Sequence, residues 1–250
     1  TAERTVLAAG TSAWPLLVDR YRTGGDKAPD RLVRLLGRVG RVLPEAEHRE
    51  VRHALAANGG DTWTWARMSW TTSRGGHMTG VHREAYARLT IGCPDGLDAF
   101  AAYLLHDNAA VRLAAAHDLA ERSTEIAHAP ADPATERARN LLVQTVRSEH
   151  PKRSPFERGE FMTVSMQLWL DEAIQAAAAA ALLECEQTPE TKADLLSHVL
   201  AHDDPDVVAR AIERWATADS LARVESMLES MRPAVRQAAT AAIERVRRTK

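Results

Sequence analysis

DNAAVRLAA at Asp107–Ala115 and RPAVRQAA at Arg232–Ala239 are two copies of one pattern in this 250-residue chain. In each copy turn-forming residues lead to a valine, and alanines follow three and four positions later. Residues so spaced lie on one face of a helix, where valine packs and alanine lets a neighbouring helix approach closely. A looser third copy, DPDVVARAI, occupies Asp204–Ile212. The repetition predicts stacked helices.

The helix ends before two of these copies are also alike, since both finish in His-Asp. His106 and His202 are 96 positions apart. That separation fits two units of about 48 residues, close to the ~40–47 residues of a HEAT-type helix pair. Three Asp-Pro or Thr-Pro pairs are typical of an N-cap followed by a first-turn proline: Asp132-Pro133, Thr188-Pro189 and Asp204-Pro205.

The rest of the chain is also mostly helical in its periodicity. Expected helices in the second half run over 109–122, 133–148, 160–186, 190–202, 205–217, 219–230 and 232–247. In the first half, residues 30–43 place apolar side chains on one face (Leu32, Leu35, Leu36, Val39 and Val42) and arginines on another (Arg31, Arg34, Arg38 and Arg41). A second helix is expected over 45–57. The arginine face, together with Arg49 and Arg52, is interpreted as solvated or paired with the acidic C-terminal half. The alternative is a surface for an acidic partner or a nucleic-acid backbone.

The Val-Arg-x-Ala-Ala segment after a short turn resembles the HEAT and HEAT-like repeats of bacterial scaffold proteins, phycobilin-lyase-type proteins and alkylpurine DNA glycosylases. The resemblance covers residues 97–250 and implies an all-α fold of HEAT-like antiparallel helix pairs in a short curved solenoid. We expect one continuous domain over residues 1–250. Within it, N-terminal helices fill 1–57, an insertion rich in Trp, Gly and Arg fills 58–96, and HEAT-like repeats fill 97–250.

Composition excludes several classes of protein. The formal net charge is −2, which argues against a general nucleic-acid binder. Residues 1–96 carry 14 Lys and Arg against 10 Asp and Glu, whereas residues 97–250 carry 18 against 24. The longest apolar run is far shorter than the ~20 residues that span a bilayer, and the first 25 residues lack the order of a signal peptide. The two cysteines, Cys93 and Cys185, define no disulfide framework, so a cytoplasmic setting is expected.

The insertion concentrates aromatic and cationic side chains in a segment where the helical pattern breaks. Apolar walls with a few polar donors are typical of ligand sites, and arginines bind anions through paired hydrogen bonds. The alternative interpretation is a local mini-core or a flexible surface loop. The predicted ligand-binding residues are Trp63, Trp65, Trp70, Arg67, Arg74, His77 and His82.

Carboxylates that follow the first repeat are the candidates for acid–base chemistry. Asp118, Glu121 and Glu125 fall on one helix face, and like charges so placed can raise the pKa of one member. We therefore predict Asp118 and Glu121 as catalytic residues, with a solvated acidic face as the alternative. His198 and His202 have metal-ligand spacing, but the repeat itself explains His202, so no metal and no cofactor is expected.

Three functions compete. The first is a binding or scaffold protein that engages a protein partner, or a small anionic or zwitterionic molecule, through the insertion. The second is a cofactor-independent enzyme that performs acid–base chemistry on a small molecule, for example in secondary metabolism. The third is a DNA repair protein similar to the alkylpurine glycosylases. Such a protein would need a basic concave face, whereas residues 97–250 are acidic.

Overall fold

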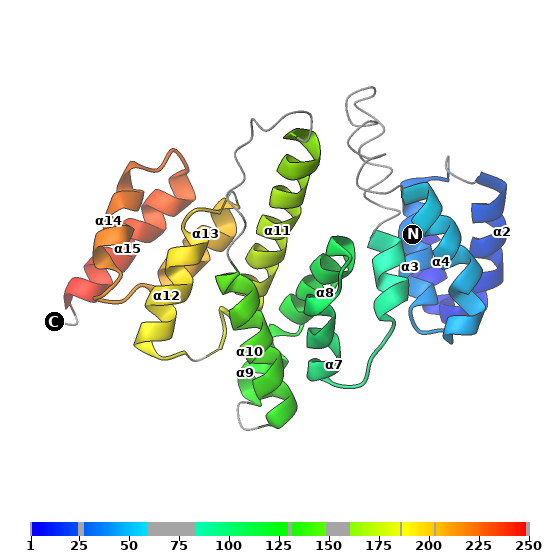
Figure 1. Ribbon diagram of the computed structural model, residues 1–250, viewed down its shortest axis with the longest axis horizontal. Helices are drawn as coiled ribbons and strands as arrows, with labels where there is room; N and C mark the ends of the chain where they lie inside the picture. Colours follow the sequence, from blue (N-terminus) through cyan, green and yellow to red (C-terminus); the bar gives the residue numbers. More distant parts are fainter. Residues whose placement is uncertain are drawn as a thin grey trace. The chain divides into compact units, whose positions relative to one another are not determined.

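The described residues of the chain form helices, many of them joined by short turns (Figure 1). The computed structural model describes residues 2–24, 28–59, 84–129, 132–148, 161–185, 187–202 and 204–248, and these ranges contain no strand. The predicted all-α class is confirmed. No helix within these ranges is long and apolar enough to cross a membrane.

The chain divides into two compact units. The N-terminal unit comprises Thr1–Asp95, His106–Ala114 and Arg153–Gln167, and the C-terminal unit comprises Gly96–Leu105, Ala115–Lys152 and Leu168–Lys250. Each unit has its own set of internal contacts. The expectation of one continuous repeat domain stays a prediction.

The N-terminal unit is built around one amphipathic helix, α3. Its elements are α1 (Ala2–Ala9), η1 (Gly10–Ala13), α2 (Trp14–Gly24), α3 (Asp30–Gly40), α4 (Glu45–Gly59) and a helix over residues 84–91. Helix α3 contacts α1, η1 and α2, and its apolar stripe, which includes Val33 and Leu36, lies in the core with Leu55 of α4. Val42 does not continue the stripe as predicted: α3 ends at Gly40, and Val42 is 57% exposed in the following turn.

Residues 84–91 correct the expectation that the helical pattern breaks over 58–96, because they form a helix. Ala85 and Leu89 of this helix belong to the core of the N-terminal unit. Gly37 of α3 makes that packing possible: a Cβ at its position would lie 2.9 Å from the Cα of Ala85. The absence of a side chain therefore lets two backbones approach closely.

The remaining helices form the C-terminal unit, except for the first residues of α8 and α11. They are α7 (Leu97–Ala102), η3 (Tyr103–Leu105), α8 (Ala109–Glu121), α9 (Ser123–His128), α10 (Pro133–Arg147), α11 (Phe161–Leu182), α12 (Pro189–Val199), α13 (Pro205–Trp215), α14 (Leu221–Ser226), η4 (Met227–Glu229) and α15 (Pro233–Arg248). Most of these bounds lie close to the predicted ones. The sequence pattern gave no bounds for α7 and did not separate α9 from α8.

Three of these helices begin at the predicted caps. The Asp132 carboxylate accepts a hydrogen bond from the backbone N–H of Thr135 at 2.9 Å, and the Thr188 hydroxyl accepts from Thr191 N–H at 3.3 Å. Asp204 accepts from two N–H groups of the first turn of α13. A proline follows each cap at the first helical position, where it has no hydrogen bond to lose.

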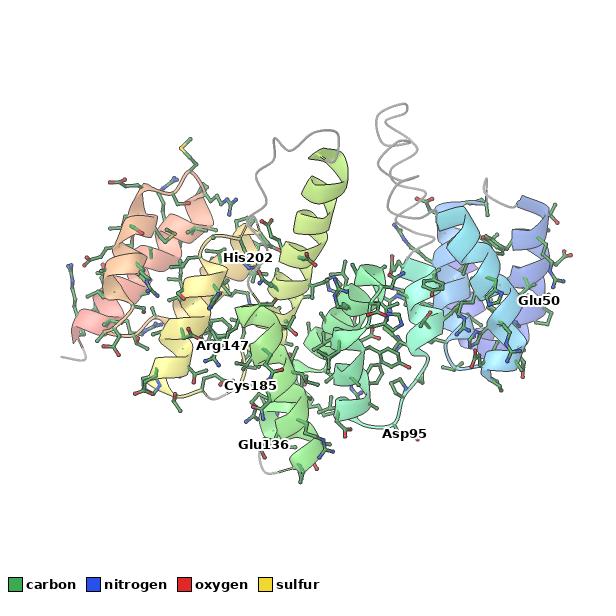
Figure 2. All side chains as sticks on the ribbon, viewed as in Figure 1. Glu50, Asp95, Glu136, Arg147, Cys185 and His202 are labelled. Carbon is green, nitrogen blue, oxygen red and sulfur yellow. The ribbon has the colours of Figure 1, made fainter. Side chains whose placement is uncertain are left out.

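Helices of the C-terminal unit pack as pairs. Helix α12 contacts α13, and α14 contacts α15, while α10 contacts both α7 and α12, and α13 contacts α15. The valines of the repeated pattern lie in these contacts: Val208 and Val235 are each 1% exposed. Arg147 at the end of α10 forms an ion pair with Asp194 of α12 at 2.6 Å (Figure 2). The predicted packing role of the repeated valine is confirmed.

Candidate functional site

A pocket of about 290 Å³ opens in the C-terminal unit, and three segments far apart in the sequence line it. Helix α8 supplies His117 and Ala120, and the α12–α13 junction with the start of α13 supplies His202, Asp204 and Val207. Helix α11 supplies Glu172, Ala173, Ala176, Ala177 and Ala180. Figure 2 marks His202 at that junction.

Four alanines of α11 form the floor of this pocket. Ala173, Ala176, Ala177 and Ala180 follow the spacing of one helix face. Their single methyl groups leave an apolar hollow where larger side chains would fill the space. Other alanines of the same helix, such as Ala178 and Ala179, are fully buried. Some alanines of α11 are therefore buried in the helix packing, as expected, and others line the pocket.

The polar groups of the pocket are carboxylates and imidazoles. Asp204 is held in place because its Oδ1 accepts backbone N–H groups of Asp206 at 3.0 Å and Val207 at 3.2 Å. The backbone carbonyl of His202 accepts a hydrogen bond from Arg232 at 2.5 Å, which anchors the junction on the turn before α15. Within the described ranges, the side chain of Glu172 makes no hydrogen bond or ion pair.

Among the residues that the structure describes, no lysine or arginine lines this pocket. Two carboxylates over an apolar floor create a negative potential that attracts cations. The same pocket holds imidazole and carboxylate groups that can exchange protons. The arrangement thus suits a small molecule with an ammonium group and a short apolar body.

The predicted catalytic residues have different environments on α8. Asp118 is buried at 5% exposure, whereas Glu121 is exposed, and neither lines the pocket. Glu125, the third member of the predicted acidic face, pairs with Arg122 at 2.8 Å. His117, the neighbour of Asp118 in the sequence, does line the pocket, because its side chain points from a different face of α8.

The predicted ligand-binding residues of the insertion lie outside the described ranges: Trp63, Trp65, Trp70, Arg67, Arg74, His77 and His82. Their role in binding a protein partner or a small anion stays a prediction. His198 lies in the last turn of α12 and His202 follows the helix; Nε2 of His198 is 3.8 Å from the carboxylate of Asp194. No group of three or more His, Cys, Asp and Glu side chains in the described part of the chain is arranged to hold a metal ion.

The two cysteines are expected to differ strongly in reactivity. Cys93 is exposed, whereas Cys185 is buried, and burial raises the pKa of the Cys185 thiol despite the nearby Arg139. Because the thiolate is the reactive form, we expect Ellman's reagent to titrate one thiol in the folded protein and two in denaturant. The variant Cys93→Ser should show no rapid reaction in the folded state. Rapid modification of both thiols in the native protein would contradict the burial of Cys185.

The chain matches no protein-family model, no curated protein and no solved structure. The residues of the pocket and the packing of the helices therefore carry the functional inference.

The pocket residues were only partly accessible to sequence analysis. The repeat draws attention to His202, whereas Glu172 and His117 are not among the predicted site residues. The alanine spacing along α11 was the available signal. It did not identify a pocket because closely packed helices show the same spacing.

Proposed function

We propose that the chain is a helical-repeat binding protein of HEAT-like type, and that its C-terminal unit binds a small organic cation in the alanine-floored pocket. The observation that carries this proposal is the lining itself: Glu172 and Asp204 line the pocket together with four alanines of α11, and no lysine or arginine of the described residues lines it.

The HEAT-like assignment is supported by the order of helix contacts in the C-terminal unit. Helix α10 contacts both α7 and α12, and the second helices of the α12–α13 and α14–α15 pairs also contact each other. Such stacking of alternate helices is typical of repeat proteins, in which each repeat packs mainly on its neighbours. It makes the short curved solenoid the favoured architecture for residues 97–250.

The size and charge of the pocket define the proposed ligand. A volume of about 290 Å³ lies at the small end of the range of ligand pockets, roughly 300–1,000 Å³. An ammonium group can donate charge-assisted hydrogen bonds to Glu172, and these are stronger than bonds between neutral groups. The methyl groups of Ala173 and Ala176 can contact a short alkyl body. A primary amine of about four carbons is therefore a suitable probe.

n-Butylamine is expected to bind more tightly than n-butanol, which has the same length but no charge at neutral pH. In Glu172→Gln the affinity for the amine should fall about tenfold, since loss of a charge-assisted bond costs on the order of 1.5 kcal/mol. The matched control is Glu213→Gln, which removes an exposed carboxylate of α13 outside the pocket and should change affinity less than twofold. Isothermal titration calorimetry measures both ligands on the parent protein and on the two variants.

A second variant tests the position of the ligand. Ala176→Leu fills the floor of the pocket and should abolish binding of both probes, while circular dichroism checks that the helices remain. Equal affinity for amine and alcohol, or equal losses in Glu172→Gln and Glu213→Gln, would contradict the proposed cation site.

The enzyme alternative keeps one observation in its favour. His117 and Glu172 line the same pocket, and a histidine with a carboxylate is a common proton-transfer pair. Nuclear magnetic resonance spectra of a bound amine, recorded before and after prolonged incubation with the protein, separate the two functions. Unchanged spectra favour binding alone, whereas conversion favours catalysis.

A further inference from the structure

A second pocket, of about 410 Å³, lies within the N-terminal unit. It is formed where the α3–α4 turn and the first turns of α4 meet the end of the 84–91 helix and the residues that follow it. Its lining consists of Arg41, Val42, Leu43, Pro44, Glu45, His48, Arg52, Leu89, Thr90, Ile91, Gly92 and Cys93. Its lining residues 89–93 lie near the end of the 58–96 segment, after the predicted ligand-binding residues of that segment.

The charge of this pocket is opposite to that of the first one. Arg41 and Arg52 line it together with one carboxylate, Glu45. Arg52 pairs with Glu45 at 2.7 Å, and Nε of Arg41 donates a hydrogen bond to the carbonyl of Gly92 at 3.2 Å, which fixes one wall of the pocket. The positive end of the dipole of α4, a 15-residue helix, lies on the same side.

His48 is the most informative residue in the wall. It is 4% exposed, and its Nδ1 makes no hydrogen bond within the described part of the chain. A buried polar atom without a hydrogen bond costs free energy, on the order of 1–3 kcal/mol. Because Nδ1 is buried, an acceptor in the pocket reaches it only when the ring turns toward the pocket, and the hydrogen bond would then remove this cost.

We propose that this pocket binds a small molecule through a single oxyanion group, with the charges of Arg41 and Arg52 attracting the anion and the ring of His48 turning to donate a hydrogen bond to it. The juxtaposition of two guanidinium groups, a helix N-terminus and a buried imidazole favours an anion over a cation or a metal. Sulfate, phosphate and carboxylate share this chemistry. The site is independent of the cation pocket, because every residue that lines it belongs to the N-terminal unit.

Protonation of His48 should accompany binding. In the free protein, burial and then the charge of Arg52 lower the pKa of His48, against the opposing effects of Glu45 and Glu47. The ring is therefore neutral at pH 7. An anion beside the ring favours the imidazolium and raises its pKa, so binding takes up a proton and tightens as pH falls from 8 toward 6.

Cys93 provides a direct readout of occupancy, because it is exposed and lines the same pocket. We expect sulfate to slow alkylation of Cys93 by iodoacetamide in a saturable manner, at an ionic strength held constant with chloride. Phosphate and acetate, measured in the same way, show which oxyanion the pocket prefers. The affinity for sulfate should fall at least fivefold in Arg52→Gln. Arg49→Gln is the matched control, since Arg49 is an exposed arginine of the same helix outside the pocket, and it should stay within twofold of the parent.

The pH dependence of sulfate affinity isolates the contribution of His48. Sulfate keeps its charge between pH 6 and 8, so any change in its affinity over this range reports the protein. Affinity should rise as pH falls in the parent protein, and His48→Gln should bind sulfate with little pH dependence. Thermal melts confirm that each variant is folded. Failure of sulfate, phosphate and acetate alike to protect Cys93, or equal losses in Arg52→Gln and Arg49→Gln, would overturn the proposal.

Discussion

Val235→Asp is expected to lower the free energy of unfolding by roughly 3–5 kcal/mol, the cost of an uncompensated charge in a packed interior. Val235 is 1% exposed on α15, the helix that contacts both α13 and α14. The substitution removes the apolar contacts of valine as well as burying a carboxylate without a partner. Because a domain of ordinary stability has only about 5–15 kcal/mol in total, much of the C-terminal unit should unfold cooperatively at low urea concentration.

The matched control is Gln237→Asp, which places the same residue two positions away on an exposed part of α15. It should change stability by no more than about 0.5 kcal/mol. Urea denaturation followed by circular dichroism at 222 nm, the helix wavelength, compares the two variants. Equal midpoints for Val235→Asp and Gln237→Asp would show that the repeated valine does not hold the helices together.

Gly37→Ala is expected to destabilise the N-terminal unit, although alanine is the better helix former. In an exposed helix interior the change should stabilise by about 1 kcal/mol. At this position the new Cβ would lie 2.9 Å from the Cα of Ala85 and 3.2 Å from its Cβ, so α3 and the 84–91 helix must move apart. Overpacking of this kind costs about 1–3 kcal/mol, and the backbone contact places the expected loss in the upper part of that range.

Arg34→Ala serves as the comparison, because Arg34 is exposed on the same helix and should tolerate the change to within about 0.5 kcal/mol. Differential scanning calorimetry gives both melting temperatures. A melting temperature for Gly37→Ala at or above that of the parent would mean that the two helices do not approach as closely as the structure shows.

Local features of the fold were accessible from the sequence because their causes act within one or two helical turns. Asp132, Thr188 and Asp204 were identified as caps, and each does accept the first-turn N–H groups of the helix that follows it. The buried faces of α13 and α15 were also predictable, since valine and alanine recur at helical spacing. Such signals need no knowledge of which segments become neighbours.

The helix over 84–91 was not predicted from the sequence. Its buried positions alternate, with Ala85, Ala87, Leu89 and Ile91 buried and the residues between them partly exposed. A helix that is enclosed on several sides has no polar face, so it lacks the 3.6-residue stripe that would reveal it. The glycine-rich stretch before this helix made its pattern harder to recognise.

The helical class, the repeated packing faces and most helix boundaries can be predicted from the sequence, because each depends on residues close together in the chain. The two pockets depend on tertiary structure. His117, Glu172 and His202 come from separate segments, and the alanine face of α11 becomes part of a pocket only where these segments meet. His48 likewise gained its significance from burial, which desolvates its ring and lowers its pKa. Pockets and pKa shifts arise from the three-dimensional surroundings of a residue, and no short-range pattern encodes those surroundings.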